Sequence, residues 1–124
     1  MTQKLQSLAQ ALLDAAKTAG AQAADAIVVD GRSIDISLRK GALEQAQRSE
    51  EIELGLRVLI DGRQACVSVS DISERTIADV AERAVAMAKE APIDPYAGLA
   101  DPSELIRTWD LAALEIYDNS AEPQ

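Results

Sequence analysis

The sequence predicts an α+β domain, in which an antiparallel four- to five-stranded sheet carries two helices packed on one face as a two-layer sandwich. Three observations predict this fold. Apolar residues recur at helical spacing in two stretches, one in each half of the chain, and they alternate with polar residues between those stretches. Short turn signals ending in glycine interrupt the alternation. A chain of 124 residues supports one such core, and with only 2% aromatic residues that core is aliphatic.

The first helix is expected from Gln3 to Ala19, where one apolar stripe follows the helical period. Gly20 is its expected C-cap. The stripe consists of Leu5, Leu8, Ala9, Leu12, Ala16 and Ala19.

Alternation begins after this helix and predicts a series of strands. A strand over Ala26–Val29 is followed by Asp30–Gly31, a strong two-residue hairpin signal. The next strand has one apolar face, and Lys40–Gly41 turns the chain into a weaker, polar strand over Leu43–Arg48. That apolar face consists of Ile34, Ile36 and Leu38.

The longest expected strand is Glu51–Ile60, and Asp61–Gly62 closes a second hairpin after it. The apolar faces of this strand and its successor consist of Ile52, Leu54, Leu56, Val58, Ile60, Ala65, Val67 and Val69. Gly55 marks either a β-bulge, which its position favours, or a close backbone approach.

A second helix follows, because the apolar period changes to that of a helix from Ile77 onward. Asp71 or Ser73 caps it, and it stops before Pro92. The expected domain spans residues 1–100. Residues 101–124 form a linker or the start of a following domain, with one short helix around Ser103–Leu114.

Both helices have one apolar stripe and therefore cover one face of the sheet, which leaves the other face without cover. Antiparallel sheets tolerate water on one face, so a solvated face and a face that binds a partner both remain open interpretations. That face is expected to carry Asp35, Ser37, Arg39, Glu53, Gly55, Arg57, Gln64, Cys66 and Ser68.

Charge and composition exclude several functions. A formal net charge of −9 argues against binding to nucleic acid or to anionic lipid. A single cysteine excludes an internal disulfide and fits a cytoplasmic protein, and no apolar run is long enough to span a membrane.

The sequence contains no histidine, which removes the commonest general base and the commonest zinc ligand. The carboxylates fall on polar helix faces, in turns or on the exposed phase of strands, and neither nucleotide-binding glycine motif occurs. No catalytic, cofactor-binding or metal-ligating residue is therefore expected in this chain.

A set of short motifs occurs in a fixed order along most of the chain. The motifs are Leu12–Lys17 with Gly20–Ala21, Arg39–Glu44, Gly55–Val58, Arg63–Ala65 to Ser70–Asp71, Ala91–Pro92 and Asp94–Pro102. In their order and spacing they resemble the N-terminal domain of the TldD/PmbA family, and the last motif resembles the PmbA (TldE) branch more than TldD. The resemblance extends from about Leu5 to Pro102.

The resemblance implies a cytoplasmic protein several times longer than one domain. In that family, TldD-type subunits carry zinc on a HExxxH helix in their C-terminal half. TldE-type subunits lack those ligands and pair with TldD as a peptidase that acts on unfolded peptides. An older family name is modulator of DNA gyrase. None of the zinc ligands maps onto this chain, which resembles a truncated domain or an unusually short member.

The leading hypothesis is thus a non-catalytic scaffold and interaction domain of a TldE/PmbA-like subunit. Its partners would be its own C-terminal domain, a TldD-like subunit and unfolded peptides, one of which could add to an edge strand. The alternatives are a free-standing acidic adaptor unrelated to proteolysis and a self-contained carboxylate-dependent enzyme. The expected interface residues are Arg39, Arg57, Gln64, Ser68 and Trp109, the last because its apolar segment has no partner within the predicted fold.

Overall fold

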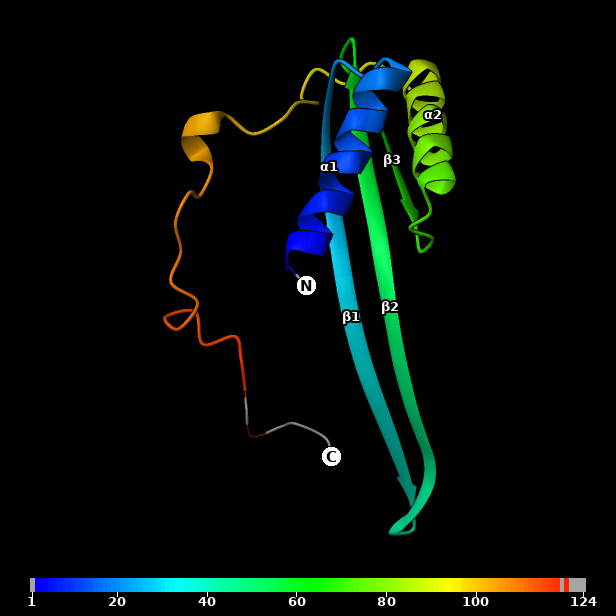
Figure 1. Ribbon diagram of the computed structural model, residues 1–124, viewed down its shortest axis with the longest axis vertical. Coiled ribbons are helices and arrows are strands. Elements are labelled where there is room, and N and C mark those ends of the chain that lie inside the picture. The colour runs from blue at the N-terminus through cyan, green and yellow to red at the C-terminus, as the bar shows by residue number, and fades with distance from the viewer. Residues whose placement is uncertain (1, 119, 121–124) are drawn as a thin grey trace.

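The computed structural model describes residues 2–118 and 120 and shows two helices on one face of an antiparallel sheet (Figure 1). Strand order is β1-β2-β3, so the chain makes a simple meander. The predicted α+β class is confirmed. The elements are α1 (Thr2–Ala19), β1 (Ala23–Arg39), β2 (Ala42–Ile60), β3 (Arg63–Val69), α2 (Glu74–Glu90) and the short 3-10 helix η1 (Pro102–Glu104).

The helix ends follow from local sequence. Gly20 has φ +108°, and the backbone N–H groups of Gly20 and Ala21 donate to the carbonyls of Lys17 and Ala16, which satisfies two otherwise unpaired groups at the end of α1. Ser73 caps α2, because its side chain accepts a hydrogen bond from the Thr76 N–H. Asp71 supports this cap and accepts from the Ser73 N–H at 2.9 Å.

Two of the three predicted hairpin turns are present. In Lys40–Gly41 and in Asp61–Gly62 both residues have positive φ, between 50° and 76°, as a two-residue hairpin turn of type I′ requires. The register follows from these turns: Ile60 pairs with Arg63, and Arg39 pairs with Ala42.

The predicted turn at residues 30–31 is wrong, and with it the expectation of four to five strands. Asp30 pairs with Ile52 and Gly31 pairs with Glu51, inside one uninterrupted ladder. Neither residue has the positive φ that the turn needs. Each predicted pair of short strands, 26–29 with 34–39 and 43–48 with 51–60, is therefore one long strand.

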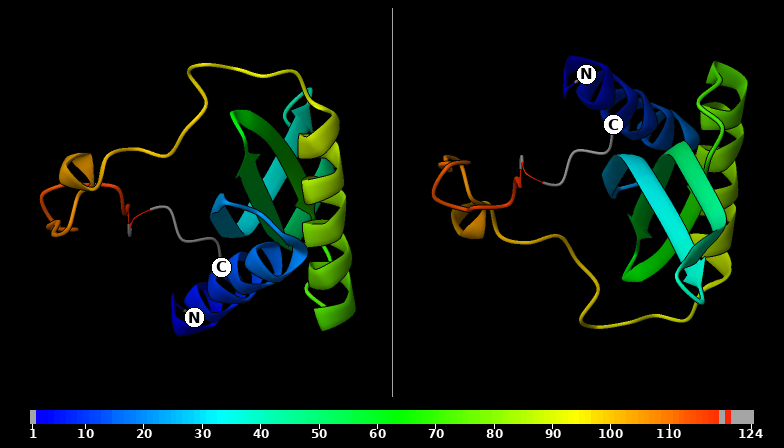
Figure 2. Two further views of the ribbon diagram at one scale, coloured as in Figure 1. Left: turned by 90° about the horizontal axis from the view of Figure 1, so that it is seen from above. Right: turned by 90° about the horizontal axis from the view of Figure 1, so that it is seen from below.

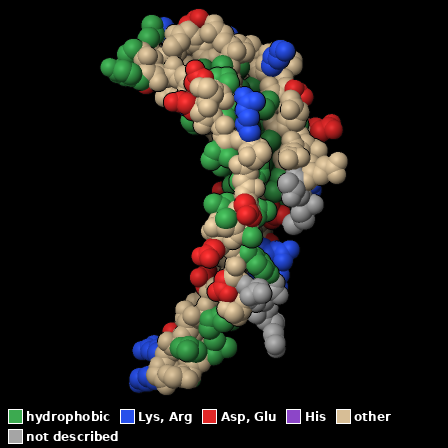
Figure 3. All heavy atoms as spheres, turned by 90° about the vertical axis from the view of Figure 1, so that its left-hand side faces the viewer, with side chains coloured by type: hydrophobic (Ala, Val, Ile, Leu, Met, Phe, Trp, Pro, Cys, Tyr) green, Lys and Arg blue, Asp and Glu red, His purple; other side chains and the backbone are tan. Residues whose placement is uncertain are grey.

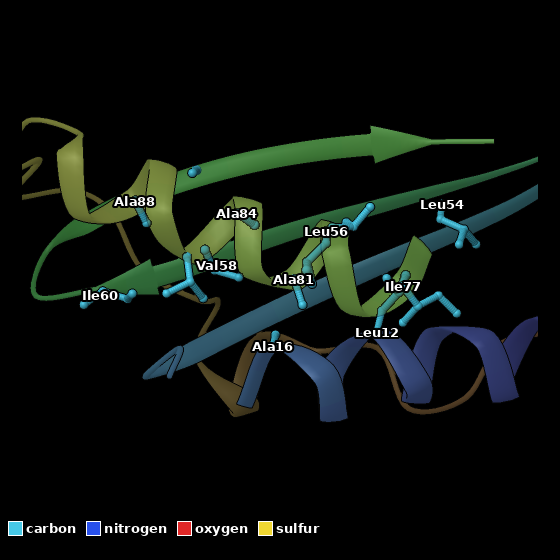
Figure 4. Packing of buried hydrophobic residues seen from close by; sticks show 13 residues of the cluster. Leu12, Ala16, Leu54, Leu56, Val58, Ile60, Ile77, Ala81, Ala84 and Ala88 are labelled. Carbon is cyan, nitrogen blue, oxygen red and sulfur yellow. The ribbon is translucent and has the colours of Figure 1, made fainter. Parts of the chain in front are cut away.

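The core lies between the helices and the end of the sheet near the β2–β3 turn (Figure 4). The apolar stripes of both helices meet the alternating face of β2, where Leu54, Leu56 and Val58 are at most 2% exposed. Helix α1 packs on β1 and on α2, while α2 packs on β2 and β3. The predicted apolar faces of β2 and of the two helices are thus confirmed.

We call the two helices, β3 and strand residues 23–29 and 54–60 the body.

The remainder of the β1–β2 hairpin, residues 30–53, extends beyond both helices as a two-stranded ribbon, which we call the arm (Figures 1 and 2). Its side chains are largely exposed: Ile36 is 64% and Leu38 is 67% accessible. A register shift between Ser37 and Leu38 places one extra residue, Glu44, on β2 near the tip.

The C-terminal segment, residues 99–118, consists of turns and extended chain and stands apart from the helices and the sheet (Figure 2). The short helix expected over residues 103–114 is not formed; η1 is three residues long, and isolated turns follow. An isolated helix of this length without a packed face is marginal in water. Residues 119 and 121–124 of the predicted linker lie outside the described residues. Among those described, neither helix is long and apolar enough to cross a bilayer.

Candidate interaction surfaces

The body sheet has an open face opposite the helices, and an ion pair between its first two strands organises it. The Arg57 guanidinium donates to both oxygens of Asp25, at 2.9 and 2.7 Å, across directly paired positions of β1 and β2. The hydrogen bond to Asp25 raises the pKa of Arg57 above its ordinary value. These two hydrogen bonds hold the Arg57 side chain, which is 31% exposed, beside Asp25.

A shallow depression of about 300 Å³ lies beside this ion pair. Gly55 is one of its lining residues, and a Cβ at this position would lie 2.8 Å from the Ile27 Cγ2 atom, so the glycine leaves room for that side chain. The expected bulge at Gly55 is wrong, since the ladder is regular at this position. The close neighbour of Gly55 is the Ile27 side chain, not the backbone that the alternative expectation named. The depression is lined by Asp25, Ala26, Ile27, Gly55, Leu56, Arg57, Cys66, Val67 and Ser68.

The structure brings together only part of the predicted interface set. Arg57 and Ser68 line the depression, and Gln64 lies further along β3 on the same face. Arg39 lies at the far tip of the arm and pairs with Glu44 at 3.6 Å. Trp109 lies in the C-terminal segment and is 65% exposed.

Sequence reasoning missed Asp25 and Ile27 as members of this face. Both occupy the polar phase of β1, and Ile27 is 64% exposed although it is apolar. The signal was available in the alternation: counting back two positions at a time from Ser33 places both residues opposite the core.

A second charged cluster lies at the base of the arm. Arg32 and Arg48 both approach Glu50, which accepts from Nε of Arg48 at 3.1 Å and lies 3.6 Å from Nε of Arg32. The hydrogen bond and charge of Arg48, followed by the charge of Arg32, lower the pKa of Glu50. This cluster interrupts the apolar face of the hairpin where the body ends.

The described residues contain no candidate metal centre. Across residues 2–118 and 120, no three Cys, Asp or Glu side chains are grouped so that they could hold a metal. A catalytic zinc requires three such ligands in reach of one another. The residues present therefore do not fit the zinc that the sequence resemblance associates with TldD-type subunits.

Residues 24–88, which include nearly all of β1 and α2 and everything between them, match the model of PmbA/TldA metallopeptidase domain 1. The chain belongs to the PmbA/TldD family. It is 31% identical over 116 residues to a metalloprotease PmbA homolog from Haemophilus influenzae, an alignment that covers 93% of this chain and 25% of that protein. It is 30% identical to metalloprotease PmbA from Escherichia coli, covering 85% of this chain and 22% of that protein.

Solved structures share the fold of this PmbA/TldD domain. A candidate modulator of DNA gyrase from Bacteroides thetaiotaomicron aligns with TM-score 0.77 and 24% identity over 85% of this chain and 24% of its own. TldE from Thermococcus kodakarensis aligns with TM-score 0.69 and 17% identity, and the alignment covers 90% of this chain and 25% of that protein. The chain spans about a quarter of the length of the curated relatives it matches.

Proposed function

We propose that this chain acts as a non-catalytic scaffold and interaction domain of a PmbA/TldE-like subunit in a cytoplasmic, TldD/TldE-type zinc metallopeptidase complex that acts on unfolded peptides. Residues 101–124 serve as a linker to a following domain or as the start of that domain. The observation that carries the proposal is the open face around Arg57, which combines a fixed ion pair with an apolar depression.

That face has the features of a surface covered by another domain. The depression is lined mainly by apolar atoms, Gly55 leaves room there for the Ile27 side chain, and the Asp25–Arg57 pair provides polar groups beside them. Interfaces commonly combine a desolvated centre with such a polar rim. Because relatives are about four times longer, the remainder of such a protein is the natural partner for this face.

Hydrogen exchange tests this assignment. Exchange is measured on this chain and on a longer polypeptide that continues into the downstream reading frame, if one is encoded. The proposal expects added protection at Arg57, Gln64 and Ser68 and across residues 109–116 in the longer polypeptide, with the exposed side of α2 as an internal reference. Identical exchange in both would contradict it and favour the free-standing adaptor.

A pair of variants tests the same face in the assembled complex. Ser68→Arg fills the depression with a charge, whereas Ser70→Arg places the same side chain just after β3. The proposal expects Ser68→Arg to weaken assembly with the TldD-like subunit or its peptidase activity, and Ser70→Arg to leave both unchanged. Equal behaviour of the two variants would count against the interface.

The non-catalytic role has its own test. The purified chain should contain far less than one zinc per molecule and should leave unfolded peptides uncleaved, because it lacks histidine and has no described ligand cluster. Stoichiometric zinc, or cleavage that a chelator abolishes, would overturn this role.

A further inference from the structure

We propose that residues 102–114 fold into an amphipathic helix that packs on the open face of the body, opposite α1 and α2. This inference deepens the proposed function, on which it rests, because it names the segment of the chain that first covers the face around Arg57. With this helix in place the body has three layers, and its sheet is covered on both faces.

The start of such a helix is already formed in the structure. Asp101 is the N-cap of η1, and its side chain accepts a hydrogen bond from the backbone N–H two residues on, at 2.9 Å. Pro102 follows at the first position and Glu104 at the third, an order typical of a helix N-terminus. Further along, the Leu114 N–H donates to the Asp110 carbonyl at 3.3 Å, which is the i to i−4 spacing of an α-helix. The local signals for a helix are therefore present at both ends of the segment.

The segment lacks a surface that would bury its apolar residues. These residues recur at helical spacing and would form one stripe of a helix, with Leu111 on the opposite side. In the structure Ile106 is 78% and Trp109 is 65% exposed. A lone helix of this length is marginal in water, so it forms only when the stripe is packed. The stripe consists of Leu105, Ile106, Trp109, Ala112 and Ala113.

The point where the chain leaves the body limits which surface this helix can reach. The Asp94 N–H donates to the Gly62 carbonyl at 2.8 Å, which ties the chain to the β2–β3 turn. Leu105 follows about 11 residues later and lies within roughly 36–40 Å of that turn at full extension. Along the sheet, Gly55 is about 23 Å from the turn, whereas the exposed apolar residues of the arm begin at the level of Ile34, about 46 Å away. The helix therefore reaches the open face of the body but not the apolar face of the arm.

The open face fits the helix in position, length and chemistry. In both views of Figure 2 the C-terminal segment lies on the side of the sheet away from α2. Figure 3, seen from the side of that segment, shows hydrophobic side chains exposed among acidic ones. A helix over residues 102–114 is about 20 Å long, and strand residues 23–29 extend over about 23 Å. Ile27 and Val29, which are 64% and 47% exposed, are the apolar side chains that it would cover.

Charge places the helix over the body rather than further along the same face. One basic and two acidic residues give residues 102–114 a formal charge of −1. On the arm, this face carries Asp35, Glu51 and Glu53, which would repel the segment. On the strands of the body its charged residues are Asp25 and Arg57, which pair with each other.

Chemical cross-linking of the purified chain tests the proposal, because Cys66 lines the depression and is the single cysteine of the chain. A second cysteine is introduced in the stripe, as Ala113→Cys, or on the opposite side of the helix, as Leu111→Cys. The two positions are close in sequence, so an unfolded segment brings both to Cys66 equally often. A short bis-maleimide links thiols that meet, and intact mass measures the product. We expect the intramolecular product to form at least about tenfold faster with Ala113→Cys.

A helix-breaking variant completes the test. Ala112→Pro should remove the preference for Ala113→Cys, because proline in a helix interior breaks the helix. Equal rates for the two cysteines, or a preference that survives Ala112→Pro, would overturn the proposal. A preferred product that joins two chains would assign the face to the segment of a second copy and would also overturn it. These outcomes leave the proposed function standing, because its readout is added hydrogen-exchange protection around Arg57 in the longer polypeptide.

Discussion

The body and the arm share two strands and the same alternating pattern, yet the apolar residues of this face are buried in the body and exposed in the arm. Leu56 in the body is 2% exposed, whereas Leu38 in the arm is 67% exposed. Both occupy the same face of one hairpin. Alternation therefore identifies which face of a strand is apolar, but whether that face is buried depends on what covers it.

Element length explains the difference. A helix of 17 or 18 residues, such as α2 or α1, is about 27 Å long, whereas the 19 residues of β2 extend over about 60 Å. Two such helices, packed side by side near one end of the sheet, cover about half of the hairpin. The cluster of Arg32, Arg48 and Glu50 lies where that cover ends.

The largest effect is expected from a charge on the shared face. Val58→Asp places an unpaired carboxylate at a position that is 0% exposed, so the chain should fail to fold. Ile36→Asp makes the same kind of change in the arm and should leave the helical circular dichroism signal intact. Loss of the fold in both variants would mean that the arm is part of the core.

A smaller change should separate the two regions by degree. Leu56→Ala removes buried methyl groups and should lower the free energy of unfolding by about 2–5 kcal/mol. Leu38→Ala should change it by no more than about 0.5 kcal/mol, as at ordinary surface sites. Denaturant melts of both variants measure the difference, and equal costs would contradict the proposed division into body and arm.

Two glycines after aspartate test the corrected topology. Gly62 has φ +73°, so Gly62→Ala should cost about 1–2 kcal/mol. Gly31 lies within a strand at ordinary φ with no atom near the position of a Cβ, so Gly31→Ala should be neutral or stabilise by up to about 1 kcal/mol. A clear loss of stability with Gly31→Ala in thermal melts would contradict the continuous strand and favour a turn at residues 30–31.

The smallest effect concerns two carboxylates with lowered pKa values. Hydrogen bonds from the Ser73 N–H and then from Thr76 lower the pKa of Asp71, which supports the cap of α2 in the body. A depressed folded-state pKa stabilises the protein above the ordinary carboxylate range, and this contribution is lost as the pH falls through the folded value.

Asp71→Asn should therefore be less stable than the parent at neutral pH, with the difference closing as the pH falls below about 4. Glu50→Gln, at the base of the arm, should change global stability less, because the arm can open without unfolding the body. Urea melts at several pH values compare the two. If the stability difference between Asp71→Asn and the parent grew as the pH fell, the lowered pKa of Asp71 would not be the cause of that difference.

The sequence predicted the parts of the fold that local physics determines. Both helix ends, the turns at Lys40–Gly41 and Asp61–Gly62, and the phase of β2 follow from capping, turn chemistry and alternation. The turn at residues 30–31 was wrong because Asp-Gly has a strong turn propensity that a long ladder overrode.

The open face was only partly predictable. Arg57 and Ser68 came together because alternation alone fixes their phase. Predicting the Asp25–Arg57 ion pair requires the register of β1 against β2. The predicted turn at residues 30–31 would instead pair residues 26–29 with the strand that follows the turn. Predicting that the arm is exposed requires knowing where the helices pack on the sheet, and the alternation within one strand does not contain that information.

Amide hydrogen exchange of the dilute chain tests the division into body and arm most directly. Amides of residues 54–60 should exchange only on global unfolding, since they lie beneath both helices. Amides of residues 34–38 and 43–48 should exchange orders of magnitude faster, through local opening of the ribbon. Equal protection along the whole of β2 would show that the apolar face of the arm is buried in the monomer and would contradict the account.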